Sequence, residues 1–102
     1  MPKHELGEVV AERHLLLRST DGVESPVYVA VGRPRLSGHD WLCPYEIEFQ
    51  GDRRSFAIYG LDSVQALVLT MKTIDVELEV RAKQADGVLL WHGEPFHSLQ
   101  DP

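Results

Sequence analysis

The alternation of apolar and polar residues is sustained longest between positions 41 and 50. One face of an extended chain here carries Trp41, Cys43, Tyr45, Ile47 and Phe49, and the other carries Leu42, Pro44, Glu46, Glu48 and Gln50. A period of two over ten residues is typical of a strand with one buried face and one face that is mostly exposed to solvent. Pro44 has no N–H to donate to a neighbouring strand, so it indicates an edge position or a bulge.

Two earlier segments are predicted to pair as a hairpin. Residues 8–18 mix apolar and polar side chains in a way that suits a long strand, and residues 27–31 place a valine at every second position. Thr20-Asp21-Gly22 forms the turn between them, because Asp can bond its own backbone and Gly accepts a positive φ. Gly51-Asp52 similarly predicts a turn before a short strand over residues 55–59.

The segment that starts at Asp62 predicts one long helix. Asp62, with Gln65 three residues later, has the layout of a capping box in which Asp replaces the usual Ser or Thr. Apolar residues then recur at steps of three and four. They form a stripe of Leu61, Val64, Leu67, Val68, Met71, Ile74 and Leu78. Such a stripe is expected to lie on the apolar face of a sheet.

The end of this helix has two interpretations. Residues 76–80 alternate between apolar and charged side chains, which fits a helix that stops near Ile74 and a strand that follows. Asp86-Gly87 is the better stop signal, so we favour a helix that continues to about Lys83. With a last strand over residues 88–92, the order is β-β-β-β-α-β. The fold class is α+β, an antiparallel sheet of four to five strands packed on one long helix.

Length and composition predict one globular domain over residues 1–102, with 1–6 and 94–102 as loose termini. The chain is 43% hydrophobic and 25% charged, which is ordinary for a globular protein. Its net charge of −6 has the wrong sign for tracking a phosphate backbone, so we expect no nucleic-acid partner. No apolar run is long enough to span a bilayer, and the start of the chain lacks the pattern of a secretory signal, so we expect no membrane partner. A single cysteine suits a reducing compartment, and we expect a cytoplasmic location.

Residue types that carry catalysis are present without the spacing that catalysis needs. The five histidines form no metal-binding motif, although His14 and His92 on neighbouring strands could form a composite pair. Ser37-Gly38-His39-Asp40 is a turn rather than part of a hydrolase triad. Cys43 lies on the apolar face and is expected to behave as a small buried hydrophobe. We therefore predict no catalytic residue, no metal site and no cofactor.

Two motifs resemble a family of small uncharacterised bacterial proteins. They are Trp41-Leu42-Cys43-Pro44-Tyr45-Glu46-Ile47 and Gly60-Leu61-Asp62-Ser63-Val64-Gln65-Ala66-Leu67. The family patterns are Trp-x-Cys-Pro-aromatic-x-Ile and Gly-x-Asp-x-x-Gln-Ala-Leu. The resemblance implies a bacterial source and a common fold, and it transfers no activity. It makes Cys43, Pro44 and Asp62 structural motif positions, which core packing, a bulge and a helix cap already explain.

Two classes of function fit these features. The first is a non-enzymatic protein-interaction module, either a homodimer or the partner of another protein, such as an acidic protein that neutralises a basic toxin. Its basis is the acidic charge and a second sheet face that carries polar groups. The alternative is a small-ligand-binding or enzymatic domain. Its pocket would lie between the sheet and the start of the helix and would be lined by Trp41, Tyr45, Tyr59 and Gln65.

Overall fold

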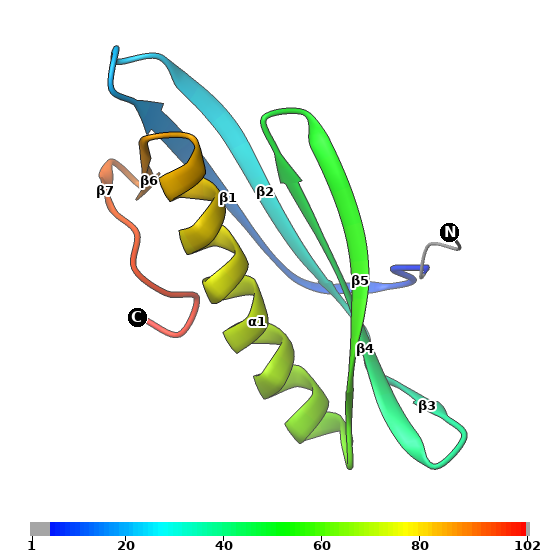
Figure 1. Cartoon of the computed structure of the whole chain (residues 1–102). Helices are drawn as coiled ribbons and strands as arrows, with labels where there is room; N and C mark the ends of the chain where they lie inside the picture. Colours follow the sequence, from blue (N-terminus) through cyan, green and yellow to red (C-terminus); the bar gives the residue numbers. More distant parts are fainter. Residues whose placement is uncertain (1–4, 102) are drawn as a thin grey trace.

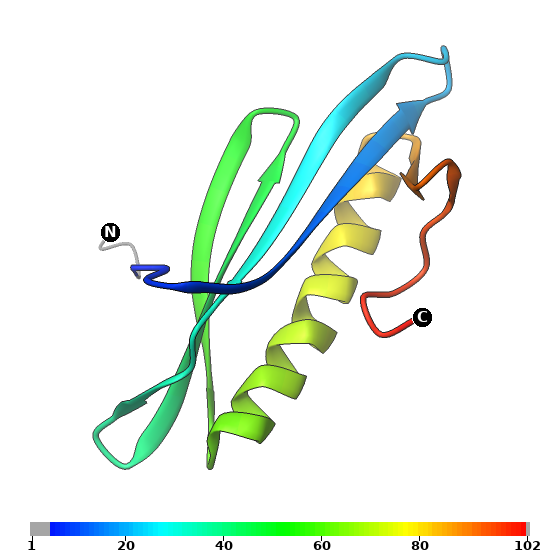
Figure 2. The same cartoon turned by 180° about the vertical axis from the view of Figure 1, so that it is seen from behind.

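A computed structural model describes residues 5–101 as an antiparallel sheet with one helix across it (Figure 1; Figure 2). The elements in chain order are β1 (Val9–Ser19), β2 (Glu24–Gly32), β3 (Arg35–Ser37), β4 (Asp40–Phe49), β5 (Asp52–Gly60), α1 (Ser63–Gln84), β6 (Gly87–Trp91) and β7 (Glu94–Pro95). The predicted α+β class is confirmed, with five strands rather than four before the helix. Within the described part of the chain, no helix has both the length and the hydropathy to cross a membrane.

The sheet is built from two long hairpins joined side by side. β1 pairs with β2, β4 pairs with β5, and β2 joins the two hairpins by pairing with β4, while β6 adds to the other edge of β1. β3 also pairs with β4. Because β5 occupies one edge of β4 over its whole length, β2 and β3 follow one another along the opposite edge. The two strands that the sequence did not predict, β3 and β7, have three and two residues, too few to show a period.

Pro44 lies where the ladder along this edge of β4 is interrupted. The last pair with β2 is Val31 with Tyr45, and the first pair with β3 joins Arg35 to Leu42. The N–H that proline lacks would therefore lie at a gap between the two partner strands, so its absence removes no hydrogen bond from the pairing of β4 with β2 or β3. The predicted irregularity at Pro44 is an interruption beside an internal strand, not a sheet edge.

The helix packs on the sheet through a row of residues spaced four apart. The buried members of α1 are Ala66, Thr70, Ile74, Leu78 and Ala82. The predicted stripe is wrong in part, since Leu61 and Val64 are 77% and 67% exposed. The buried row has Ala66 and Ala82 at its two ends, where the small side chains let the helix approach the sheet closely, and Ile74 and Leu78 supply its bulk. The helix runs to Gln84, which confirms that it continues past Ile74 to about Lys83.

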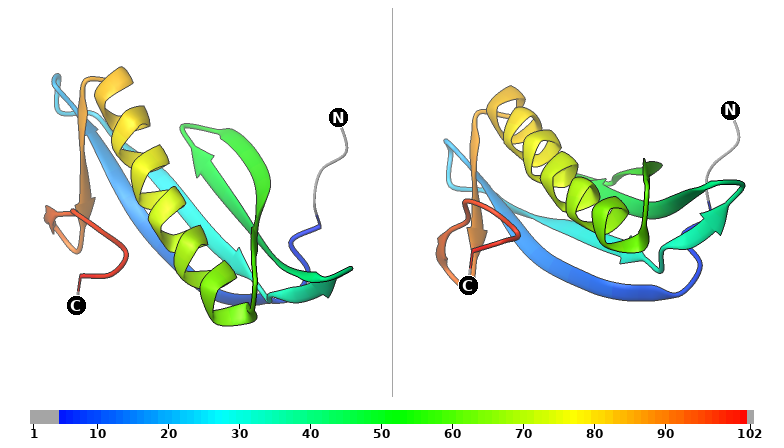
Figure 3. Two further views of the ribbon diagram at one scale, coloured as in Figure 1. Left: turned by 60° about the horizontal axis from the view of Figure 1, so that its bottom comes forward. Right: turned by 90° about the horizontal axis from the view of Figure 1, so that it is seen from below.

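The inner face of the sheet supplies the rest of the core. Cys43, Tyr45, Ile47 and Phe49 are buried under α1 as predicted. Among residues 5–101 no helix covers the opposite face (Figure 3). This face is nevertheless less exposed to solvent than expected, because Leu42, Pro44 and Glu46 are also buried.

Part of this outer face is covered by the segment that precedes β1. A Cβ added at Gly32 would lie 2.1 Å from the Leu6 carbonyl oxygen and 2.7 Å from Pro44 Cγ. The backbone at Leu6 therefore crosses directly over β2 and β4. This crossing accounts for the burial of Pro44 on the face that was predicted to be mostly exposed to solvent.

The segment after β6, predicted as a loose tail, makes specific contacts. The Phe96 amide donates to the Leu89 carbonyl at 2.9 Å. Further along, Ser98 Oγ and the Leu99 amide donate to the two carboxylate oxygens of Asp75 at 2.7 and 2.9 Å. The chain thus returns along α1 after β7, and Leu99 is held against the middle of the helix.

Candidate functional site

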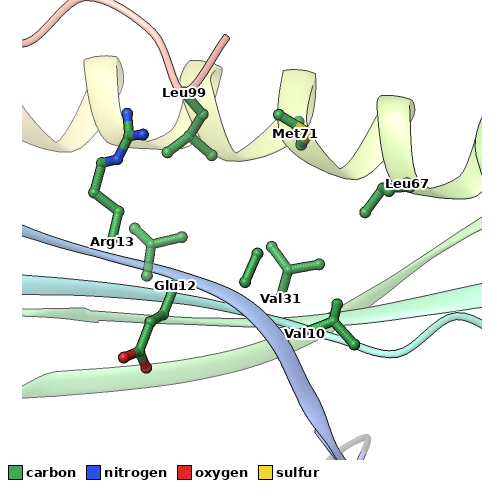
Figure 4. Close-up of a pocket in the computed structure, with 9 residues that line it drawn as sticks. Val10, Glu12, Arg13, Val31, Leu67, Met71 and Leu99 are labelled. Atoms are coloured by element: carbon green, nitrogen blue, oxygen red, sulfur yellow. The ribbon is translucent and has the colours of Figure 1, made fainter. Parts of the chain in front are cut away.

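A cavity of about 420 Å³ opens between the first half of β1 and the first half of α1 (Figure 4). Its lining residues are Val10, Ala11, Glu12, Arg13, Val29, Val31, Leu67, Met71 and Leu99. β6 pairs with β1 only from Leu16 to Ser19, so within the described chain no strand flanks the first half of β1 on this side. The register shift between Val9 and Ala11 also interrupts the regular alternation of β1, and Val10 lines the cavity at this point. These two features leave space that the core does not fill.

Arg13 is the charged side chain that reaches into this space. It follows the inward-facing alternation of Leu15 and Leu17, and Figure 4 shows its side chain rising toward α1 beside Leu99. The guanidinium carbon lies 3.9 Å from the centre of the Trp91 ring and 5.9 Å from that of Phe96.

The Arg13 guanidinium has no hydrogen-bonded or ionic partner in the described part of the chain. Its Nη1 atom is buried without a hydrogen bond, and none of the ion pairs among residues 5–101 includes it. Sequence reasoning missed this residue. Its alternation with Leu15 and Leu17 was the available signal, but Trp91, Phe96 and Leu99 reach it from the far end of the chain.

The four residues predicted to line a pocket are not brought together. Tyr45 is buried beneath α1, and its hydroxyl donates to Glu77 at 3.4 Å. Tyr59 pairs with Leu42 on the other face of the sheet and is half exposed. Trp41 is partly buried at the edge of the core, and Gln65 is exposed at the start of α1. None of the four lines the cavity beside Arg13.

The motif residues build the joint between β5 and α1. Asp62 Oδ1 accepts from the Gln65 amide at 2.7 Å, and Gln65 Oε1 accepts from the Leu61 amide at 2.7 Å. The predicted cap is present, with the return bond made one residue earlier than in the usual capping box.

Cys43 is buried in the core, as the sequence predicted. Its Sγ lies 3.7 Å from the Gly32 carbonyl oxygen. Burial raises the pKa of the Cys43 thiol, an effect that a hydrogen bond with Thr70 partly offsets. The thiol is therefore the stable form, which fits a packing role and not a nucleophilic one.

Charged groups on the outer face of the sheet are paired with one another. Tyr28 donates to Glu12 at 2.5 Å, and this bond raises the pKa of the tyrosine. Arg53 contacts Glu46 at 2.8 Å and Glu48 at 2.9 Å. His14 lies against Tyr28 with ring centres 4.8 Å apart and ring planes tilted by 41°. Within residues 5–101, no three His, Cys, Asp or Glu side chains are arranged to hold a metal ion.

The solvent side of α1 is a second candidate surface. It carries the exposed residues Val64, Lys72, Val76 and Val80 and the half-buried Val68, spaced four apart on the side opposite the buried row. We call this set the valine ridge. A helix that covers a sheet normally presents polar residues outward, so four valines here are a departure from the usual pattern.

The fold and these surfaces define a small α+β domain, one antiparallel sheet with a single helix on one face in the described chain. Residues 11–102 match the model of the family described as Domain of unknown function (DUF6968), and the chain belongs to this family. No curated protein and no solved structure matches the chain. The family brings no activity with it, and the bacterial source implied by the motifs stays a prediction.

Proposed function

We propose that this protein is a non-enzymatic interaction module that forms a homodimer through the valine ridge of α1. The observation that carries the proposal is the apolar character of α1 on two opposite sides. One side is used within the chain, through Ile74 and its neighbours at spacings of four. The other leaves Val76 62% exposed. Exposed apolar patches of this kind mark association surfaces.

A second copy is the occupant that suits the ridge best. Residues spaced four apart form a ridge that packs into the equivalent grooves of another helix at about −50°. A twofold axis between Lys72 and Val76 places Lys72 of each copy against Val76 and next to Glu79 of the other. Glu79 is exposed and contacts Lys83 of its own helix at 3.2 Å, and Lys72 of the second copy would share this carboxylate. A parallel arrangement would instead bring the two Lys72 side chains together.

The idea of an acidic protein that neutralises a basic partner has less support. Several acidic side chains on the sheet are already bound to arginines of the same chain. Arg18 contacts Glu24 at 2.7 Å, and Arg53 holds Glu46 and Glu48. A basic partner would have to displace these pairs, whereas contacts between the valines of the two ridges displace no ion pair.

Sedimentation equilibrium of the full chain, over a range of concentrations, tests the homodimer. The wild-type chain is expected to show a concentration-dependent dimer mass. Val76→Lys should weaken dimerisation by about tenfold or more, because each copy loses a buried valine worth about 1.5 kcal/mol or more. Val23→Lys is the matched control, since Val23 is also 62% exposed but lies in the turn between β1 and β2.

A charge exchange tests the antiparallel arrangement. Lys72→Glu and Glu79→Lys should each weaken the dimer, and the double variant should recover part of the loss. A wild-type chain that stays monomeric at the highest concentration would overturn the proposal. Equal effects of Val76→Lys and Val23→Lys would overturn the ridge as the interface.

A further inference from the structure

We propose that the cavity between β1 and α1 binds a hydrophobic carboxylic acid, with the carboxylate on Arg13 and the hydrocarbon chain along the apolar lining. This site is separate from the valine ridge. It uses Leu67 and Met71, which face β1, whereas the ridge faces solvent. The inference does not depend on the homodimer.

The lining beyond Arg13 is suited to a hydrocarbon chain. Val10, Val31, Leu67 and Met71 supply apolar surface from both the sheet and the helix. The volume of about 420 Å³ lies within the range of small-molecule sites, which are mostly apolar with a few fixed polar groups. An unbranched chain fills such a narrow apolar space without burying further polar atoms.

Arg13 supplies the polar group that would fix the orientation of the ligand. Trp91 and Phe96 contact the guanidinium, so its position is restrained before a ligand arrives. Nη1 is closed off from solvent and has no hydrogen bond within the described chain, so the carboxylate would pair with the other N–H donors of the guanidinium from the side of Arg13 that lines the cavity. A planar guanidinium matches a carboxylate with two parallel hydrogen bonds, which makes a carboxylate the expected acceptor.

The acidic side chains near this cavity do not compete for Arg13. Glu12 also borders the cavity, but Figure 4 shows its carboxylate directed away from the helix. There it accepts the hydrogen bond from Tyr28. Asp75 is occupied by Ser98 and the Leu99 amide. The positive charge of Arg13 is therefore left for a ligand.

Fluorescence of Trp91 gives a direct measurement, because this ring lies against the guanidinium. In a Trp41→Phe background Trp91 is the remaining tryptophan, since the chain has two. We expect saturable binding of decanoate, applied below the concentration at which it forms micelles. Decanol should bind at least about tenfold more weakly, because it cannot accept two charge-assisted hydrogen bonds. Decyltrimethylammonium should show no saturable binding.

Three variants locate the site. Arg13→Met should reduce decanoate affinity by about tenfold or more, to the level of decanol. Arg54→Met is the matched control, since it removes an exposed arginine that contacts Asp52 far from the cavity. Ala11→Leu should block the apolar space and abolish decanoate binding while Arg13 stays intact, which keeps the test decisive if Arg13→Met does not fold.

Equal affinity for decanoate and decanol would overturn the carboxylate assignment. Unchanged decanoate binding in Ala11→Leu would overturn the cavity as the site. The titrations are repeated in the Val76→Lys background, where binding should persist. Loss of binding there would contradict the independence of the cavity from the valine ridge.

Discussion

Gly60 lies against the backbone of Ala66. A Cβ at residue 60 would be 2.5 Å from the Ala66 amide nitrogen and 2.8 Å from its Cα, closer than real Cβ atoms approach. The last residue of β5 and the first turn of α1 therefore fit together only with a hydrogen at this position. The contact explains why the motif begins at Gly60, and it fixes the angle at which the helix leaves the sheet.

Gly60→Ala is expected to lower the free energy of unfolding by about 1–3 kcal/mol, the usual cost of forcing an extra methyl into a packed site. Urea denaturation followed by circular dichroism measures the change. Gly22→Asn is the control, because Gly22 has a φ of 86° and open space around it, and Asn tolerates that conformation. An unaltered midpoint for Gly60→Ala would mean that β5 and α1 separate without cost.

The cap at the start of α1 gives a second prediction. Asp62→Ala removes the acceptor for the Gln65 amide and should destabilise the protein by about 1 kcal/mol. Asp62→Asn keeps an acceptor oxygen and should retain most of the stability. Thermal unfolding distinguishes the two variants. If both lose the same stability, the carboxylate charge at the helix start matters more than the hydrogen bond.

Alkaline stability should depend on Tyr45. Burial and the Glu77 carboxylate raise the pKa of this tyrosine in the folded chain. The unfolded chain ionises it near the ordinary value of about 10, so the folded state binds more protons above that pH. Its contribution to stability is therefore complete below about pH 10 and is lost as the pH rises toward the raised value.

Tyr45→Phe removes this ionisation. At neutral pH the variant should lose about 1 kcal/mol with the hydrogen bond to Glu77. Between about pH 10 and pH 11 its unfolding free energy should fall less steeply than that of the wild type. Urea titrations at these pH values measure the slopes, and parallel slopes would contradict the role of Tyr45.

The long elements could be predicted from the sequence because each carries a local signal. The ten-residue alternation marked β4, and Asp62 with Gln65 marked the start of α1. The buried face of α1 could not be predicted in the same way. It uses Ala66, Thr70 and Ala82, which are weakly hydrophobic, while bulkier valines point outward. A stripe predicted from the apolar residues alone therefore includes residues on the solvent side of α1.

The cavity was beyond prediction for a different reason. Arg13 is identifiable as a half-buried cation only once Trp91 and Phe96 are known to lie beside it, and these come from the opposite end of the chain. Tyr45 and Tyr59, two members of the predicted aromatic set, belong to different faces of the sheet. Alternation within one strand assigns a face, but it does not show which distant segments meet there.

Asp75 connects the end of the chain to the cavity. Its two oxygens hold Ser98 and the Leu99 amide, and Leu99 forms part of the cavity wall. Asp75→Ala should release this segment and cost about 1–2 kcal/mol, since two hydrogen bonds to a charged group are lost. Hydrogen exchange of the Leu99 amide should accelerate strongly, while amides in the middle of β4 keep their protection.

Lys83→Ala, which removes an exposed contact with Glu79 on the same helix, should leave the Leu99 amide protected. Protection that persists at Leu99 in Asp75→Ala would show that Phe96 and β7 alone hold the segment in place.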